Sequence, residues 1–181
     1  GIFNLCVTLN SDITIHNSGN IKNVEYMFSG CEEFNKPILF DTTNVVYMKN
    51  MFANCKKFNQ NLYFDTRNVY DMSNMFNNAT EFNSFLDFDT SNVVNMKFMF
   101  SKCSNFNQEL NYLITKRVNY MTSMFEDALS FNQPLNDWNF SNVIFMKNMF
   151  RNAISFNQQL NDWNTSNVKN MERMFCYATN Y

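Results

Sequence analysis

The chain has 181 residues, of which 45% are hydrophobic and 17% charged, and its formal net charge is −2. This length suits one well-buried core, and the charge balance lacks the basic excess that nucleic acid or anionic lipid requires. Glycine (3) and proline (2) are too scarce for a flexible linker or collagen. No apolar run approaches the roughly 18–20 residues that cross a bilayer. We therefore expect no nucleic-acid partner and no membrane insertion in this segment.

One pattern recurs along the entire chain. Its clearest mark is the pair Met-Phe, which returns every 24 or 25 residues at Met27-Phe28, Met51-Phe52, Met75-Phe76, Met99-Phe100, Met124-Phe125, Met149-Phe150 and Met174-Phe175. Ile2-Phe3 holds the same place in the first turn, and Tyr181 falls on the next aromatic position. A fixed period of this length is the signature of repeat architectures. We predict a single segment, residues 1–181, of about seven repeats that starts and ends in mid-repeat as part of a longer array.

Each repeat combines an apolar stripe with a short alternating stretch. Residues 45–55 read Val-x-x-Met-x-x-Met-Phe-x-x-Cys, a spacing typical of one face of a short helix or of 3₁₀ turns. Asn44, Asn68 and Asn92 precede such stripes, where a helix N-cap is expected. The stretch 59–64 predicts a short strand. The expected fold class is an α/β repeat solenoid, a leucine-rich-repeat-like stack of 24–25-residue turns, each with a short parallel strand and a short helix or 3₁₀ segment.

Two asparagine columns and one threonine column need a structural reason, because a buried amide is costly unless its hydrogen bonds are made. One asparagine follows an aromatic residue, as in Phe58-Asn59, and the other precedes the stripe, as at Asn44. We predict a ladder in which each inward asparagine bonds backbone groups of its own turn and of the adjacent turn. A similar turn role is expected of the threonine column, Thr42, Thr66, Thr90, Thr115 and Thr165, which Phe140 interrupts.

Cysteine, histidine and methionine occur in patterns that favour structure over chemistry. His16 is the only histidine, so no serine or cysteine triad is expected. A column that alanine fills in other repeats holds Cys6, Cys31, Cys55 and Cys103. We therefore expect buried free thiols rather than a metal set, with a Cys31–Cys55 disulfide as the alternative. The methionine column is expected in the core rather than as a lane for a soft metal.

Aspartates form a further column, at Asp41, Asp65 and Asp89. Stacked carboxylates are suited to calcium or to glycosidic chemistry, but Ile114 and asparagine hold the same column later, which favours turn hydrogen bonding. Neither a cluster of acids and bases for cleaving polysaccharides nor the two-threonine-wide ladder of an ice-binding face is found. We expect no catalytic residue, cofactor or metal, and therefore no enzyme.

The outward positions that flank the predicted strands change character along the chain. Most repeats place polar residues there, such as Glu109, Asn111, Gln159 and Asn161, whereas the first repeats place Pro37, Leu39, Tyr63 and Phe85. An exposed cluster of apolar and aromatic side chains is typical of a contact surface. These four residues are the candidate partner contact.

The repeat columns resemble those of the BspA-type leucine-rich repeats, in particular the bacterial surface protein 26-residue repeat, DUF285. The resemblance is carried by residues 131–138, Phe-Asn-Gln-Pro-Leu-Asn-Asp-Trp, and 141–150, Ser-Asn-Val-Ile-Phe-Met-Lys-Asn-Met-Phe, and residues 156–175 repeat it. It covers essentially the whole chain, although residues 28–100 have a turn one residue shorter and phenylalanine in place of tryptophan.

The resemblance implies surface display and adhesion, since such repeats occur in bacterial and mycoplasmal surface proteins, in some protists and in large DNA viruses of amoebae. We expect a non-enzymatic repeat protein at a cell or virion surface that contacts a protein or a glycan. The alternative is a structural component of a virion or cell envelope, built by lateral packing of the solenoid against capsid or envelope proteins.

Overall fold

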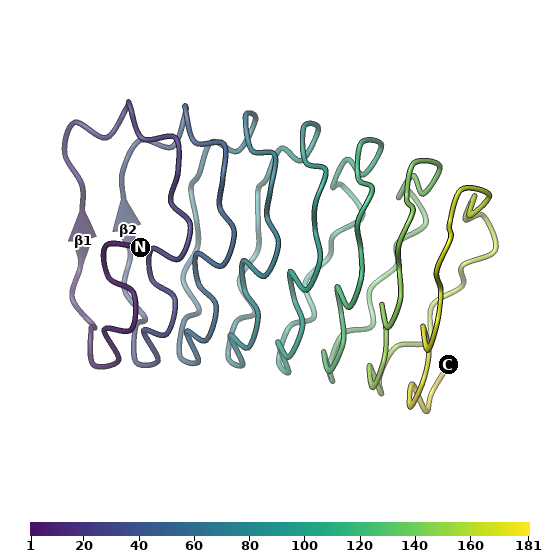
Figure 1. The fold of residues 1–181 in the computed structure, drawn as a ribbon. Coiled ribbons are helices and arrows are strands. Elements are labelled where there is room, and N and C mark those ends of the chain that lie inside the picture. Colours follow the sequence, from purple (N-terminus) through teal and green to yellow (C-terminus); the bar gives the residue numbers. More distant parts are fainter.

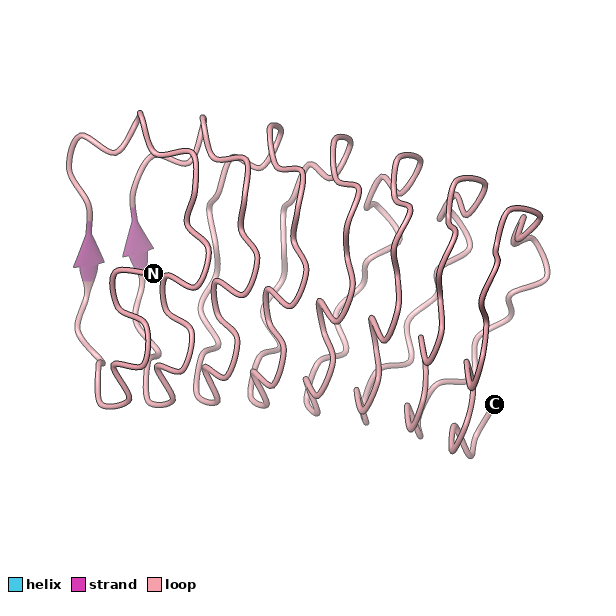
Figure 2. Cartoon of the chain, in the orientation of Figure 1, coloured by secondary structure: helices cyan, strands magenta, loops and turns pink.

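The computed structural model describes residues 1–181 and contains no helix. Its two strands, β1 (Ile13–Thr14) and β2 (Ile38–Leu39), pair in parallel with Ile13 opposite Ile38. The chain winds into a row of stacked turns, each lying beside the turn one repeat earlier (Figure 1). Apart from the two strands, the whole coil is loop and turn (Figure 2). No helix is present that could span a membrane.

The predicted α/β solenoid with a helix or 3₁₀ segment in each repeat is therefore wrong. Within the stripe 45–55, Asn50 and Asn54 have positive φ angles of 56° and 61°. Two left-handed residues four positions apart interrupt a right-handed helix. The same two positions are left-handed in each following repeat up to residue 177, so the interruption belongs to the repeat. Asn44, Asn68 and Asn92 are consequently not helix N-caps.

Backbone hydrogen bonds explain how a helix-like spacing arises without a helix. The Met51 N–H donates to the Met48 carbonyl at 3.2 Å, which closes a tight turn inside the repeat. The next N–H, of Phe52, donates to the Met75 carbonyl of the following repeat at 2.9 Å. Because this alternation continues along the stripe, consecutive tight turns bring side chains three and four residues apart to the same side. The stripe is inward, as predicted, but its backbone is bonded sideways between repeats.

The strands that do form are parallel, as expected, but they are shorter than predicted. In the stretch 59–64, only a single bridge joins Leu62 to Leu86. A second line of single parallel bridges follows the opposite limb of the coil through Asn23, Tyr47, Asp71, Asn95, Tyr120, Phe145 and Asn170. The ladders of single bridges and the alternating backbone bonds of the stripe therefore join the repeats without forming a continuous sheet.

Two columns of phenylalanine rings fill the centre of the coil. In the middle turns, Phe76 stacks on Phe52 and Phe100 at centroid distances of 5.7 Å, and it also stacks on Phe82 at 4.1 Å. These rings are fully buried within one continuous core of 46 residues. Twelve of the thirteen methionines lie in this core, so the prediction of a structural role is confirmed for all but Met171 of the last repeat, which is 45% exposed. Burial of each ring stabilises the fold by roughly 1.5–3 kcal/mol.

The predicted asparagine ladder is confirmed between adjacent turns, but its side chains are exposed or half-buried rather than inward, and the predicted bonds within a single turn are not formed by these columns. The Asn59 N–H donates to Asn35 Oδ1 at 3.0 Å, and the Asn83 N–H donates to Asn59 Oδ1 at 2.8 Å. The second column also joins repeats, since Asn68 Nδ2 donates to the Thr43 carbonyl at 2.8 Å. The turn role of the threonine column is confirmed as well, because Thr66 Oγ1 donates to the Asp89 carbonyl at 3.0 Å.

Candidate functional site

The four candidate contact residues lie on the limb of the coil that carries β1 and β2. Leu39 belongs to β2, while Pro37 directly precedes it. Tyr63 and Phe85 flank the bridge between Leu62 and Leu86, on the next two repeats. In all three repeats the middle residue, Ile38, Leu62 or Leu86, is buried in the core. Because neighbours of an inward residue in extended chain point outward, the four side chains share the outer side of this limb.

Their exposure shows that the core does not account for these residues. Tyr63 is 84% exposed, Leu39 58% and Phe85 52%, and Pro37 is exposed as well. Leaving such side chains in water forgoes the roughly 1.5–3 kcal/mol that burial of a large apolar side chain contributes. We name this surface, Pro37, Leu39, Tyr63 and Phe85, the limb patch.

Tyr112 extends the limb patch, and the sequence analysis did not single it out. Its ring lies 5.4 Å from that of Phe85, and its hydroxyl donates to the Leu86 carbonyl. Burial raises the pKa of Tyr112 to about 12, assisted by the negative charges of Asp87 and Glu109. The residue stands just before Leu113, where the turn is one residue longer than in earlier repeats, so the alignment of columns hid it. The limb patch thus has an apolar centre with two carboxylates nearby.

The residues that most often carry chemistry lie apart from one another. His16 is exposed, and no group of three or more histidine, cysteine or acidic side chains is placed to hold a metal ion. The aspartate column makes turns, as predicted: Asp41 Oδ1 accepts from the Thr43 N–H at 2.9 Å and from Thr43 Oγ1 at 2.6 Å. These two bonds lower the pKa of Asp41, and the equivalent bonds from Ser91 lower that of Asp89.

All five cysteines are free, so the alternative of a Cys31–Cys55 disulfide is wrong. The prediction of buried thiols is confirmed for Cys31, Cys55 and Cys103, whereas Cys6 in the first turn is exposed. Each buried thiol donates to a backbone carbonyl of the preceding repeat, as Cys55 Sγ does to Phe28 at 3.0 Å. Burial raises the pKa of the Cys31 thiol to about 11 and raises those of Cys55 and Cys103 further. These thiols are therefore protonated structural groups rather than nucleophiles.

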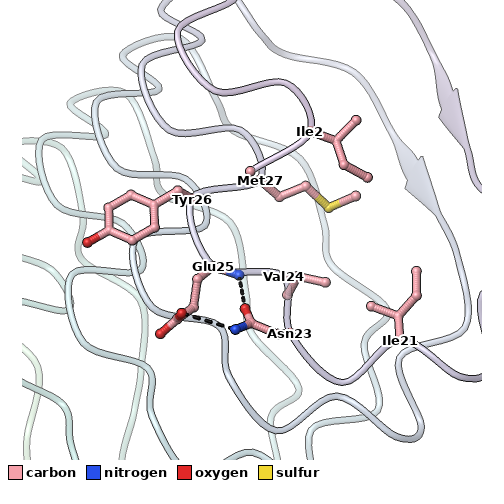
Figure 3. Close-up of a pocket in the computed structure, with 8 residues that line it drawn as sticks. Ile2, Ile21, Asn23, Val24, Glu25, Tyr26 and Met27 are labelled. Atoms are coloured by element: carbon pink, nitrogen blue, oxygen red, sulfur yellow. Dashed lines mark hydrogen bonds between the residues drawn. The ribbon is translucent and has the colours of Figure 1, made fainter.

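A cavity of about 340 Å³ lies in the first turns of the coil (Figure 3). Its wall is formed largely by Ile2, Ile21, Val24 and Met27. Two polar side chains join them, but they bond each other, since Asn23 Nδ2 donates to Glu25 Oε2 at 3.1 Å and the Glu25 N–H donates to Asn23 Oδ1 at 2.8 Å. The cavity holds no histidine, cysteine or lysine beside this carboxylate.

A coil of near-identical turns joined by ladders of side-chain and backbone bonds defines a repeat protein. The chain belongs to the family described as "Mycoplasma protein of unknown function, DUF285", which it matches over residues 1–87 and 84–181, and so the resemblance drawn from the repeat columns is confirmed. No curated protein and no solved structure matches the chain.

Proposed function

We propose that this chain is a non-enzymatic recognition module, displayed at a cell or virion surface, whose limb patch binds another protein. The observation that carries the proposal is the exposure of Leu39, Tyr63 and Phe85 at positions where most later repeats have polar residues. Aromatic side chains are enriched at the centres of protein interfaces because each covers a large area while losing few rotamers.

The surroundings of the limb patch indicate the chemistry of its partner. Asp87 stands in the column of Tyr63 and Glu109 in the column of Phe85, and both carboxylates lie near Tyr112. An apolar centre with a negatively charged edge favours a partner that presents apolar side chains next to lysine or arginine, because opposite charges raise the association rate and align the two surfaces.

The repeat itself supplies variants that test the limb patch without disturbing the coil. Asparagine stands in the Tyr63 column at Asn111 and Asn161, and glutamine stands in the Phe85 column at Gln159. The double variant Tyr63→Asn plus Phe85→Gln is expected to fold normally and to lose capture of a protein partner from native membranes or particles. Ile114→Asn is the matched control, since Ile114 is 50% exposed outside the limb patch and its column holds Asn139 and Asn164.

Two results would count against this proposal. Equal capture by the wild type and the double variant would place recognition elsewhere on the coil. Ordered self-assembly in light scattering, with no protein captured except capsid or envelope components, would favour a building block of a virion or cell envelope, which is the rival function.

A further inference from the structure

We propose that a groove on the opposite limb of the coil is a binding site for acidic saccharides, meaning sugar rings that bear a carboxylate. The groove measures about 410 Å³ and is lined by Val46, Tyr47, Asn68, Tyr70, Asn92 and Arg117. It spans four successive repeats and shares no residue with the limb patch. The proposal does not depend on a protein partner for that patch.

The cation of the groove has no carboxylate partner in the fold. The chain has four arginines, and three of them form ion pairs, Arg67 with Asp65, Arg151 with Glu126 and Arg173 with Glu172. Arg117 forms none. Its Nη1 donates to Asn92 Oδ1 at 2.6 Å, which fixes the guanidinium in the groove while its other N–H groups have no protein acceptor. A planar guanidinium presented in this way is suited to a carboxylate, which it binds through two parallel hydrogen bonds.

Arg117 also departs from its column at a structural cost. Every other member of the column from Asn44 onward is an asparagine whose amide donates to a carbonyl of the preceding repeat, as Asn92 does to Arg67 and Asn142 to Lys116. In that register the amide at position 117 would reach the Ser91 carbonyl, which accepts no hydrogen bond in this structure. The arginine thus replaces a bond of the ladder, as is common where a residue serves binding rather than stability.

Two tyrosines give the groove a preference for sugar over a simple anion. Tyr47 is 43% exposed and Tyr70 is 47% exposed, and both rings line the groove beside Arg117. Exposed aromatic faces offer apolar area with a polar hydroxyl at the edge, which suits a pyranose ring with its apolar face and peripheral hydroxyl groups. Asn68 and Asn92 also line the groove, and each donates its Nδ2 to a ladder carbonyl, while Asn92 Oδ1 accepts from Arg117. Asn68 Oδ1 accepts no hydrogen bond within the fold, so it is the amide acceptor open to a sugar hydroxyl. Cation, aromatic faces and amides together match a carboxylated sugar.

Isothermal calorimetry of the whole chain with 3′-sialyllactose and with digalacturonate tests the site, with lactose as the neutral control. We expect at least one acidic probe to bind, lactose to bind at least about tenfold more weakly, and added salt to weaken binding of the acidic probe. The two acidic probes distinguish a sialic acid from a uronic acid, and binding of either supports the proposal.

Variants taken from the repeat columns assign the binding to the groove. Arg117→Asn restores the asparagine of its column, so we expect it to raise the urea midpoint while lowering affinity about tenfold or more. Tyr70→Val introduces the residue found at Val46 and Val94, and it is expected to weaken the binding of both acidic and neutral sugars. Lys116→Ser introduces the residue found at Ser91 and Ser141, removes a neighbouring exposed cation outside the groove, and is expected to leave affinity unchanged.

Three outcomes would overturn the proposal. The first is the absence of binding by either acidic probe at millimolar concentration. The second is equal affinity of the wild type and Arg117→Asn for the acidic probe, when circular dichroism shows that both proteins are folded. The third is full competition by a polyglutamate peptide at the same carboxylate concentration, because the groove would then recognise charge alone and not a sugar.

Discussion

Replacing Lys102 by glycine should stabilise this fold, although glycine usually destabilises an ordered exposed position. The φ angle of Lys102 is 61°, which places it in the left-handed region. Its side chain is exposed and forms no ion pair, and its backbone N–H donates to the Glu126 carbonyl at 2.7 Å, a bond that glycine retains. The substitution therefore changes backbone energetics while leaving packing and hydrogen bonding almost untouched.

The expected magnitude follows from two opposing terms. A left-handed conformation costs a residue with a Cβ roughly 1–2 kcal/mol, and glycine is free of this cost. Glycine loses more chain entropy on folding, which offsets about 0.5–1 kcal/mol. The net effect is a gain of about 0.5–1 kcal/mol in the free energy of unfolding. Lys102→Asn, which copies Asn54 and Asn78 in the same column, should give a smaller gain, since asparagine tolerates this region better than lysine does.

Urea unfolding measures the effect, and Lys116→Gly is the matched control. Lys116 is also exposed and without an ion pair, but its φ is not positive. There the entropic term acts alone, and we expect a loss of about 0.5–1 kcal/mol. The reverse change, Gly30→Ala, should destabilise, because Gly30 has a φ of 76° and an added Cβ would lie 2.7 Å from Leu5 Cδ2. If Lys102→Gly and Lys116→Gly lower the unfolding free energy equally, the turn is not left-handed and the reasoning fails.

Three further predictions concern the core, the ladder and the thiols. Phe76→Ala should cost about 3–5 kcal/mol in urea unfolding, because it removes a buried ring that stacks on three others; a cost under about 1 kcal/mol would contradict the stacked core. Asn83→Ala should speed hydrogen exchange at the Asn107 N–H, which donates to Asn83 Oδ1 at 2.9 Å, whereas Asn83→Asp keeps the acceptor and should protect it. The pKa of Cys31 is raised from 9.0 to about 11, so its contribution to stability is present below pH 9 and is lost as the pH rises through about 11. Urea unfolding between pH 9 and 11 should show that the unfolding free energy of Cys31→Ala falls less steeply with pH than that of the wild type. An equally steep fall in both proteins would disprove the burial of this thiol.

The core could be predicted from the sequence because its columns depend only on which side chains point inward. Val69, Met72 and Phe76 recur in register with their counterparts, and any backbone that repeats every 24 or 25 residues brings them together. The absence of a helix could not be predicted, because consecutive tight turns and a helix both bring residues three and four positions apart to the same side. The available signal was the asparagine at Asn50, Asn54, Asn74 and Asn78, since asparagine is enriched at positive φ. The sequence pattern predicts ladder and N-cap roles for asparagine, whereas these four residues form the left-handed turns.

The limb patch could be found from the sequence because its residues are apolar in columns that are mostly polar in the later repeats. Tyr112 could not, since the longer turn at residues 111–113 displaced it from the column that would have marked it. The groove around Arg117 could be found only from the structure, because Tyr47, Tyr70 and Arg117 belong to different columns and come together only where successive repeats stack.

In a repeat protein, the departures from a column are the best guide to function. A column residue such as Asn92 is explained by its bond to the neighbouring turn, and the same explanation covers its counterparts. A departure that strengthens packing needs no functional reason, and Phe140 is of this kind, because it is buried in the threonine column and stacks on Trp163 at 3.7 Å. Tyr63 and Arg117 differ from it, since the first is exposed and the second forgoes a bond of the ladder. Neither residue improves the fold, which is why we propose a binding role for each of them.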